Sequence, residues 1–381
     1  MHTKTAAITF YVALYFFAIV PLEVQAQDSR PNVVHIFADD LGWGQVGFNN
    51  PLTHIDTPNI DALAQGGMIL SRSYASTVCS PSRANLLTGF HNGHAANDRN
   101  GNIAAGVRAQ DVTVGEIMTA AGYHTGIVGK WGWGATGTRD LSGPDPLPTI
   151  NNASTLPSVQ GYAEFFGYLN HSAAHDFYYD YMWESIGLGA TTLTTPNDDG
   201  PSGAPEYSHD LIGRRSEAFV RDNAEGAPFY LQVSYTIPHF DLDDITAAPA
   251  LVNLKGDVIF PAGLAQYNDD PSLTGQQRDF SAMISRMDAS IGSLVDRLRD
   301  PDGDGDMSDS VLANTLIIFS SDNGTTPEDG LGAAGVNDPR ISGGLLGGKR
   351  DLYEGGIRMP SLAFWEGTIP AGSSSDFLFS K

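Results

Sequence analysis

Runs of apolar residues alternate with helix-like stretches along most of the chain. The first run, NVVHIFADD at 32–40, is continuous and ends in two aspartates, which is typical of a strand buried on both faces of a parallel sheet. Later runs of the same form are HTGIVGKW, PFYLQVSY, NTLIIFSSDNG and PSLAFWEG, and helical patterns lie between them at 57–65, 81–87, 111–121, 208–223 and 276–299. This alternation predicts an α/β fold with a large, mostly parallel sheet sandwiched by helices.

Residues with distinctive chemistry extend from Asp39 to Glu354 without a break in composition, so we expect one large domain. The stretch from Ala135 to Glu206 is dense in Gly, Pro, Tyr and His, and we expect a loop-rich excursion at the rim of the sheet, where sites are often built. Seven of its aromatic residues are as consistent with a core as with a sugar-binding platform; they are Tyr162, Phe165, Phe166, Tyr168, Phe177, Tyr178 and Tyr179.

Residues 1–26 have the pattern of a cleaved secretory signal peptide. A short basic start is followed by an apolar run from Ala6 to Val20 and by the ending Val24-Gln25-Ala26. The run is shorter than the roughly 20 residues of a membrane helix, and no other segment approaches that length. We therefore expect residues 27–381 to be secreted or periplasmic, without a membrane span. A retained N-terminal anchor is the alternative.

Charge narrows the possible partners. The chain has 44 acidic and 21 basic residues, a net charge of -23, which argues against nucleic acid because binding to phosphates relies on Lys and Arg. On such an acidic chain, basic residues near an active site need a local purpose, and Arg83, Lys130 and Lys349 are the candidates. The single cysteine, Cys79, cannot form an intramolecular disulfide.

Two pairs of oxygen-bearing side chains follow apolar strands. Asp39-Asp40 and Asp322-Asn323 can converge at the carboxyl edge of one sheet, and hard divalent cations prefer such oxygen ligands. Either pair alone would be read as turn residues that end a strand. Together, and with an activated residue nearby, they favour a metal site.

The segment around the cysteine has a specific pattern. Cys79-Ser80-Pro81-Ser82-Arg83, followed by Leu86, Thr88 and Gly89, matches the C-x-P-S-R-x-x-L-x-T-G signature of the formylglycine-dependent sulfatases at every fixed position. The chain thus resembles an arylsulfatase-like member of the alkaline phosphatase superfamily. The resemblance implies an alkaline-phosphatase-like fold and a partner, a maturation enzyme that oxidises Cys79 to formylglycine (3-oxoalanine).

The resemblance extends to further segments in the family's order. NVVHIFADDLGWG and FSSDNG resemble its two metal pairs, while GKWGWG, SYTIPHF and GGKRDLYEGGIRMP resemble segments with an active-site lysine, histidine and second lysine, here Lys130, His239 and Lys349. It implies one Ca²⁺ held by Asp39, Asp40, Asp322, Asn323 and the modified residue 79. It also implies that Arg83 and Lys130 hold the hydrated aldehyde, and that Lys130, His239 and Lys349 contact the sulfate.

Two departures from the family are visible. Many members have a histidine two residues after the first lysine, where this chain has Gly132, and we hypothesise that a water, His171 or His175 takes over as proton acceptor. The chain also stops at Lys381, whereas the family continues into a smaller C-terminal domain. We therefore expect residues 27–381 to be a sulfatase catalytic domain truncated before that subdomain.

The leading prediction is an exported sulfuric-ester hydrolase acting on aryl or carbohydrate sulfates. A phosphate or phosphonate ester hydrolase on the same scaffold is one alternative, and a catalytically inactive binder of sulfated glycans is another.

Two weaker motifs remain. DPDGDGDMSD places Asp300, Asp302 and Asp304 as in a calcium loop but has Val311 where a bidentate Glu belongs, so a solvated acidic hairpin is favoured. Asn152-Ala153-Ser154 is a formal glycosylation sequon.

Overall fold

The fold was analysed in a computed structural model, which describes residues 30–100, 106–136, 149–198, 205–239, 267, 271–273, 275–327 and 336–380. The predicted signal peptide lies outside these ranges, so it stays a prediction. Within them, every helix is too short or too polar to cross a bilayer.

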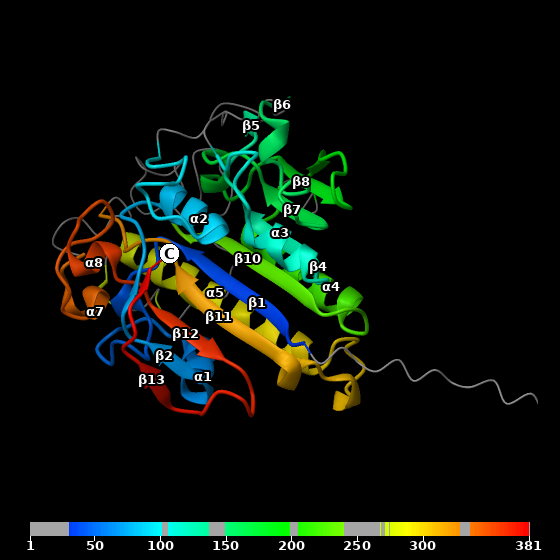
Figure 1. Ribbon diagram of the computed structural model, residues 1–381. Helices are drawn as coiled ribbons and strands as arrows, with labels where there is room; N and C mark the ends of the chain where they lie inside the picture. The colour runs from blue at the N-terminus through cyan, green and yellow to red at the C-terminus, as the bar shows by residue number, and fades with distance from the viewer. Residues whose placement is uncertain are drawn as a thin grey trace, which may run out of the picture.

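A mixed sheet with the strand order β13-β2-β12-β11-β1-β10-β4-β7-β8-β9 forms the centre of the molecule (Figure 1). Its middle strands are mutually parallel, as predicted: β11 (Thr315–Ser321), β1 (Asn32–Asp39), β10 (Phe229–Pro238), β4 (His124–Lys130) and β7 (Glu164–Tyr168). The outer strands are β12 (Ser361–Phe364), β2 (Met68–Leu70), β13 (Ser373–Ser375), β8 (Tyr181–Ile186) and β9 (Leu193–Pro196). The α/β prediction is therefore confirmed.

Two details differ from the prediction. The PSLAFWEG run forms β12, which pairs antiparallel with β11; an apolar run reports burial on both faces and not strand direction. The stretch 135–206 is not only loop, because β7, β8 and β9 within it extend the sheet. The seven aromatic residues named above are all buried, so they form core rather than a sugar platform.

Helices cover both faces of the sheet. One face packs against α1 (Pro58–Gly66), α4 (Ser208–Asn223) and α5 (Gly275–Arg299), and the other against α2 (Cys79–Thr88) and α3 (Val114–Ala120). Strand periodicity supplies both cores: Leu231 and Val233 of β10 join the first cluster, whereas Tyr230 joins the second.

Local signals begin and end the helices on the second face. Thr113 Oγ1 accepts from Glu116 N, and the Glu116 carboxylate accepts from Thr113 N, a capping box that begins α3. Helix α2 ends at Gly89, whose φ of 69° is left-handed and favours glycine. Capping thus fixes where α2 and α3 lie along the chain.

The remaining elements are short. They are η1 (Trp43–Gln45), η2 (Ala153–Thr155), η3 (Ala173–His175), η7 (Met307–Asp309), η8 (Leu312–Asn314), α7 (Pro339–Ser342), α8 (Glu354–Ile357), and the strand pairs β3 (Ser73–Tyr74) with β14 (Phe379–Ser380) and β5 (Ala135–Thr136) with β6 (Thr149–Ile150).

Candidate active site

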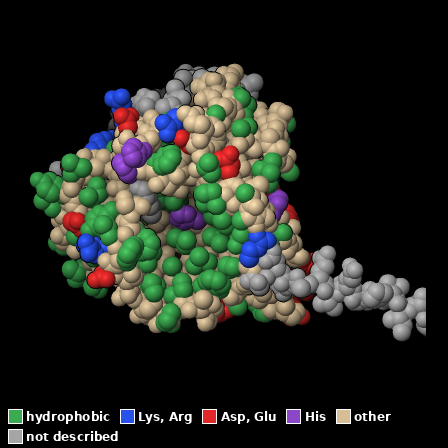
Figure 2. All heavy atoms as spheres, in the orientation of Figure 1, with side chains coloured by type: hydrophobic (Ala, Val, Ile, Leu, Met, Phe, Trp, Pro, Cys, Tyr) green, Lys and Arg blue, Asp and Glu red, His purple; other side chains and the backbone are tan. Residues whose placement is uncertain are grey.

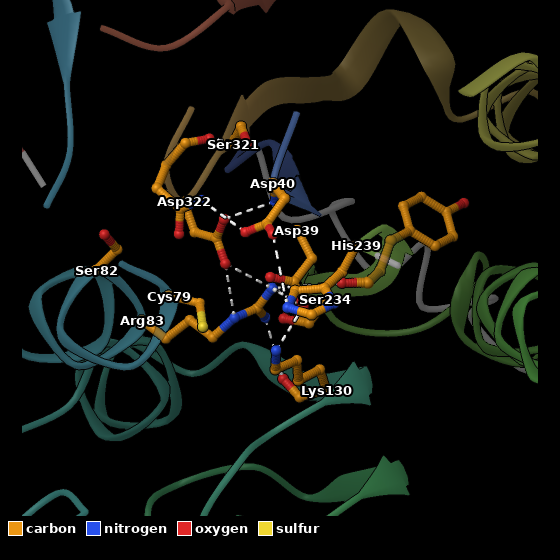
Figure 3. A network of polar contacts seen from close by, with 12 residues as sticks. Asp39, Asp40, Cys79, Ser82, Arg83, Lys130, Ser234, His239, Ser321 and Asp322 are labelled. Atoms are coloured by element: carbon orange, nitrogen blue, oxygen red, sulfur yellow. Dashed lines mark hydrogen bonds and ion pairs between the residues drawn. The ribbon is translucent and has the colours of Figure 1, made fainter. Parts of the chain in front are cut away.

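The carboxyl ends of four neighbouring parallel strands, β11, β1, β10 and β4, meet at one edge of the sheet. Asp39 and Asp40 stand at the end of β1, and Asp322 follows β11; the Asp40 backbone N–H donates to Asp322 Oδ1 at 3.0 Å. Lys130 is the last residue of β4 and His239 follows β10. Figure 3 shows these side chains turned toward one another. Parallel pairing therefore gathers residues that lie far apart in the sequence.

Helix α2 brings Cys79 to the same place. Cys79 is the first residue of the helix and is fully buried, and its sulfur lies among oxygens of Asp39 and Asp322, all within 4.8 Å of one another. Asn100 Nδ2 donates to the sulfur at 3.4 Å. Burial raises the pKa of the Cys79 thiol. An unmodified thiol here is protonated and is a poor nucleophile.

Each basic residue predicted for the site pairs with a carboxylate of the cluster. Lys130 Nζ lies 2.5 Å from Asp39 Oδ2, and Lys349 Nζ lies 2.8 and 2.7 Å from the two oxygens of Asp40. Arg83 Nε donates to Asp322 Oδ2 at 3.1 Å, and its Nη2 lies 3.5 Å from Asp39 Oδ2. All of these side chains are at least 95% buried. The three cations offset the cost of burying the carboxylates, which would be several kcal/mol per unpaired ion.

The aspartates nevertheless differ in their protonation. Burial would raise the pKa of Asp39, but the charges of Lys130 and Arg83 hold it well below its usual range. Burial and the neighbouring Asp39 carboxylate raise the pKa of Asp322 well above the usual range. A divalent cation among these oxygens would favour the charged form of both groups.

Two buried oxygens point to such a cation. Asp39 Oδ1 and Asn323 Oδ1 have no hydrogen-bond partner among the described residues, while Asn323 Nδ2 donates to Asp40 Oδ1 at 2.6 Å. Asp40 also has a left-handed φ of 66°, an uncommon conformation that concentrates at functional sites. The donor set is rich in carboxylate and amide oxygens and fits Ca²⁺.

Three buried histidines also contact residues of the site. His239 Nε2 lies 3.5 Å from Asp40 Oδ2, and its ring stacks on that of His175 with centroids 3.7 Å apart. His171 Nε2 lies 3.7 Å from Cys79 Sγ. Burial and the Lys349 charge lower the pKa of His239 to about 4, and burial with neighbouring positive groups lowers the pKa values of His171 and His175 well below their usual range. Figure 2 shows the face of the molecule seen in Figure 1, where hydrophobic side chains are numerous and charged and histidine side chains are scattered among them.

The position of Gly132 explains why a histidine is awkward there. Its φ of 103° lies in the region that L side chains rarely adopt, and a Cβ atom would lie 3.9 Å from His171 Nδ1. The contact with His171 is an ordinary van der Waals contact, so the obstacle is the backbone conformation. Introducing an imidazole by Gly132→His would be strained.

Sequence reasoning missed one contact residue and the part played by another. Asn100 holds Cys79 and accepts from Ser80 N at 3.1 Å, but it lies in a polar turn-rich segment without a distinguishing motif. His175 was considered only as a proton acceptor, whereas Lys130 Nζ donates to its Nε2 at 2.7 Å. No local pattern could have revealed either contact.

The acidic segment DPDGDGDMSD forms a separate exposed loop. Asp300 accepts backbone N–H groups from Gly303 at 2.7 Å and Gly305 at 3.0 Å, and Asp302 accepts from Asp304 N at 3.0 Å. The three carboxylates have oxygens within 4.8 Å of one another. Their exposure agrees with the favoured interpretation of a solvated acidic hairpin.

Known proteins are similar to this chain in sequence and in fold. The family model described as Sulfatase matches residues 31–380. N-acetylgalactosamine-6-sulfatase of Sus scrofa is 29% identical over 390 residues, covering 97% of this chain and 64% of that protein; arylsulfatase A of Homo sapiens is 31% identical over 361 residues, covering 90% and 60%. The crystal structure of Ps i-CgsB in complex with k-i-k-neocarrahexaose aligns with a TM-score of 0.65 at 24% identity, over 92% of this chain and 69% of that chain. The chain therefore spans 60–69% of the length of these proteins.

Proposed function

Because the chain belongs to the sulfatase family of the alkaline phosphatase superfamily, we propose that it is a sulfuric-ester hydrolase that cleaves sulfate monoesters. The observation that carries the proposal is the complete modification signature at the start of α2, with Cys79 buried against Asp39 and Asp322. A site for a small dianionic ester needs a nucleophile, positive charge and a proton donor. The described residues can supply the last two.

We assign formylglycine to residue 79 and one Ca²⁺ to the oxygens of Asp39, Asp40, Asp322 and Asn323. When present, these groups supply a hydrated nucleophile and a Lewis acid. Their fit rests on the unpartnered buried oxygens of Asp39 and Asn323 and on the place of Cys79, whose sulfur and oxygens of Asp39 and Asp322 lie within 4.8 Å of one another.

The chain's own side chains then have separate tasks. Arg83 and Lys130 orient the oxygens of residue 79 and neutralise charge, while Lys349 and His239 bind the sulfate, and one of them protonates the leaving oxygen. His171 is the best-placed proton acceptor near residue 79, since its Nε2 lies 3.7 Å from the sulfur. These roles explain why Arg83, Lys130 and Lys349 lie together in the site of an otherwise acidic protein.

The substrate class we favour is a sulfated carbohydrate. One relative is named for N-acetylgalactosamine 6-sulfate chemistry, and one structural neighbour was crystallised with a carrageenan-type oligosaccharide. We further propose that residues 1–26 direct export, so that the enzyme meets sulfated glycans outside the cytoplasm.

The test uses protein matured together with a formylglycine-generating enzyme. Intact-mass analysis measures conversion of Cys79, and sulfate release is followed on sulfated monosaccharides, aryl sulfate and aryl phosphate, with Cys79→Ala as the blank. Sulfate release that requires conversion supports the proposal. Faster release from aryl phosphate would favour the phosphoester alternative, and glycan binding without turnover by fully converted protein would favour the inactive binder.

A further inference from the structure

His175 joins two residues that belong to different strands. It lies in η3, within the excursion after β7, and is 3% exposed. Lys130 at the end of β4 donates to its Nε2 at 2.7 Å, and His239 after β10 stacks on its ring. One side chain therefore contacts a residue at the end of β4 and a residue just after β10.

The contact with Lys130 constrains both partners. An ammonium group only donates, so Nε2 of His175 must carry the lone pair and the ring proton must reside on Nδ1. Lys130 is 1% exposed, and two of its three N–H groups point to Asp39 and His175. Because two of the three N–H directions are set by these contacts, the direction of the third is set as well.

The stacking contact with His175 fixes the orientation of the His239 ring. The two imidazole planes are 4° apart with centroids separated by 3.7 Å, so the His239 ring cannot turn about its χ2 torsion without losing this contact. The same ring lies 3.5 Å from Asp40. Stacking on one face and a carboxylate at the edge hold the orientation of His239.

We propose that His175 is a positioning residue that holds Lys130 through Nε2 and His239 through the face of its ring. It aligns Lys130, which orients the oxygens of residue 79, and His239, which binds the sulfate. The catalytic consequence rests on the proposed function, whereas the arrangement itself can be tested without substrate.

Three substitutions separate the two contacts. His175→Gln keeps an acceptor for Lys130 but has no ring, so we expect a KM raised about tenfold with kcat little changed. His175→Phe keeps a ring against His239 but no acceptor, so we expect kcat lowered about tenfold with KM little changed. His175→Ala removes both contacts and is expected to lower kcat/KM by about 10- to 100-fold.

The matched control is His124→Gln at the opposite end of β4, where the histidine pairs with Glu164. It should keep wild-type kcat and KM. Melting temperatures show that each variant is folded. Equal kinetic defects in the Gln, Phe and Ala variants, or none, would overturn the division of roles.

A spectroscopic measurement tests the arrangement independently of activity. Long-range ¹H–¹⁵N spectra of the mature enzyme labelled in histidine should show a neutral His175 with the proton on Nδ1, assigned by its absence in His175→Gln. Lys130→Met should shift the Nε2 resonance of His175. A proton on Nε2 would overturn the proposal even in an active enzyme. If no sulfate ester is hydrolysed but this signature is present, the proposed function fails and the arrangement stands.

Discussion

Two clusters of possible metal ligands, one in the site and one in the acidic loop, each have ligand atoms within 4.8 Å of one another, but one cluster is buried and the other is largely exposed. Asp39, Asp322 and Cys79 come from three separate segments and are fully buried among cations. Asp300, Asp302 and Asp304 come from one loop. Backbone N–H groups donate hydrogen bonds to Asp300 and Asp302 there, whereas Lys and Arg side chains pair with the carboxylates of the site. Clustering alone therefore does not distinguish a site from a turn.

Burial makes the difference between the two groups. A buried carboxylate must be paired, so each aspartate of the site has a cation within 3.5 Å. Exposed carboxylates of the loop are solvated by water and need no such partners. We expect substitutions to have large effects in the first group and small effects in the second.

The largest effect is expected from Asp322→Ala. Removing this carboxylate weakens the proposed metal site and leaves Arg83 without its closest partner, so sulfate-ester turnover should fall by at least about three orders of magnitude. Steady-state assays of matured protein measure the loss. Asp302→Ala removes the same charge from the loop and should retain wild-type turnover; comparable losses in both would erase the distinction between the groups.

The next effect concerns the partners of Asp40. Lys349→Ala and His239→Ala should each lower turnover by roughly two orders of magnitude, the scale of a lost electrostatic or acid-base contribution. Arg299→Ala, whose exposed guanidinium pairs with Asp296, is the charge-matched control. Wild-type rates in both site variants would mean that the lysine and histidine pair with Asp40 for stability alone.

Burial also sets the pH dependence of stability, as His209 illustrates away from both groups. Burial lowers its pKa to about 4, below the value of about 6.5 in the unfolded chain. The unfolded state then binds more protons between these values, so stability falls as pH drops from about 6.5 to 4, by about 3 kcal/mol from this residue.

Denaturant titrations across that pH window measure the slope, which His209→Gln should flatten. Asp300→Asn should leave it unchanged. Desolvation would raise the pKa of Asp300, but N–H groups of Gly305 and Gly303 lower it, so this carboxylate is charged throughout the window. An equal change of slope in the two variants would contradict the assignment to the buried histidine.

The smallest effect is expected when carboxylates of the acidic loop are substituted and calcium binding is measured. Ca²⁺ that binds the folded protein raises its stability by about 2.7 kcal/mol at a concentration one hundred times Kd. Asp322→Asn should abolish the calcium-dependent rise in melting temperature, whereas Asp302→Asn with Asp304→Asn should leave it unchanged. Loss of the rise in the loop variant alone would place the bound calcium at the loop.

Strand and helix positions followed closely from the sequence because burial leaves a periodic signal. The apolar run at 32–40 became β1, and the helical pattern at 208–223 became α4 with the same bounds. Strand direction could not be predicted in this way. Strand β12 is antiparallel to β11, but its apolar pattern is the same as that of a parallel strand. The aromatic-rich excursion added strands because its tyrosines and phenylalanines pack as core.

By itself, the sequence determined the elements, the family signature at Cys79 and the residue types at the strand ends, because each of these depends on a few consecutive residues. Only the tertiary structure decided that Asn100 contacts Cys79, that Arg83 joins two aspartates, and that His175 binds Lys130 while stacking on His239. Such contacts depend on which strands are neighbours and on how far a side chain reaches across them. Strand order arises from packing the whole sheet, so no local stretch of sequence contains it.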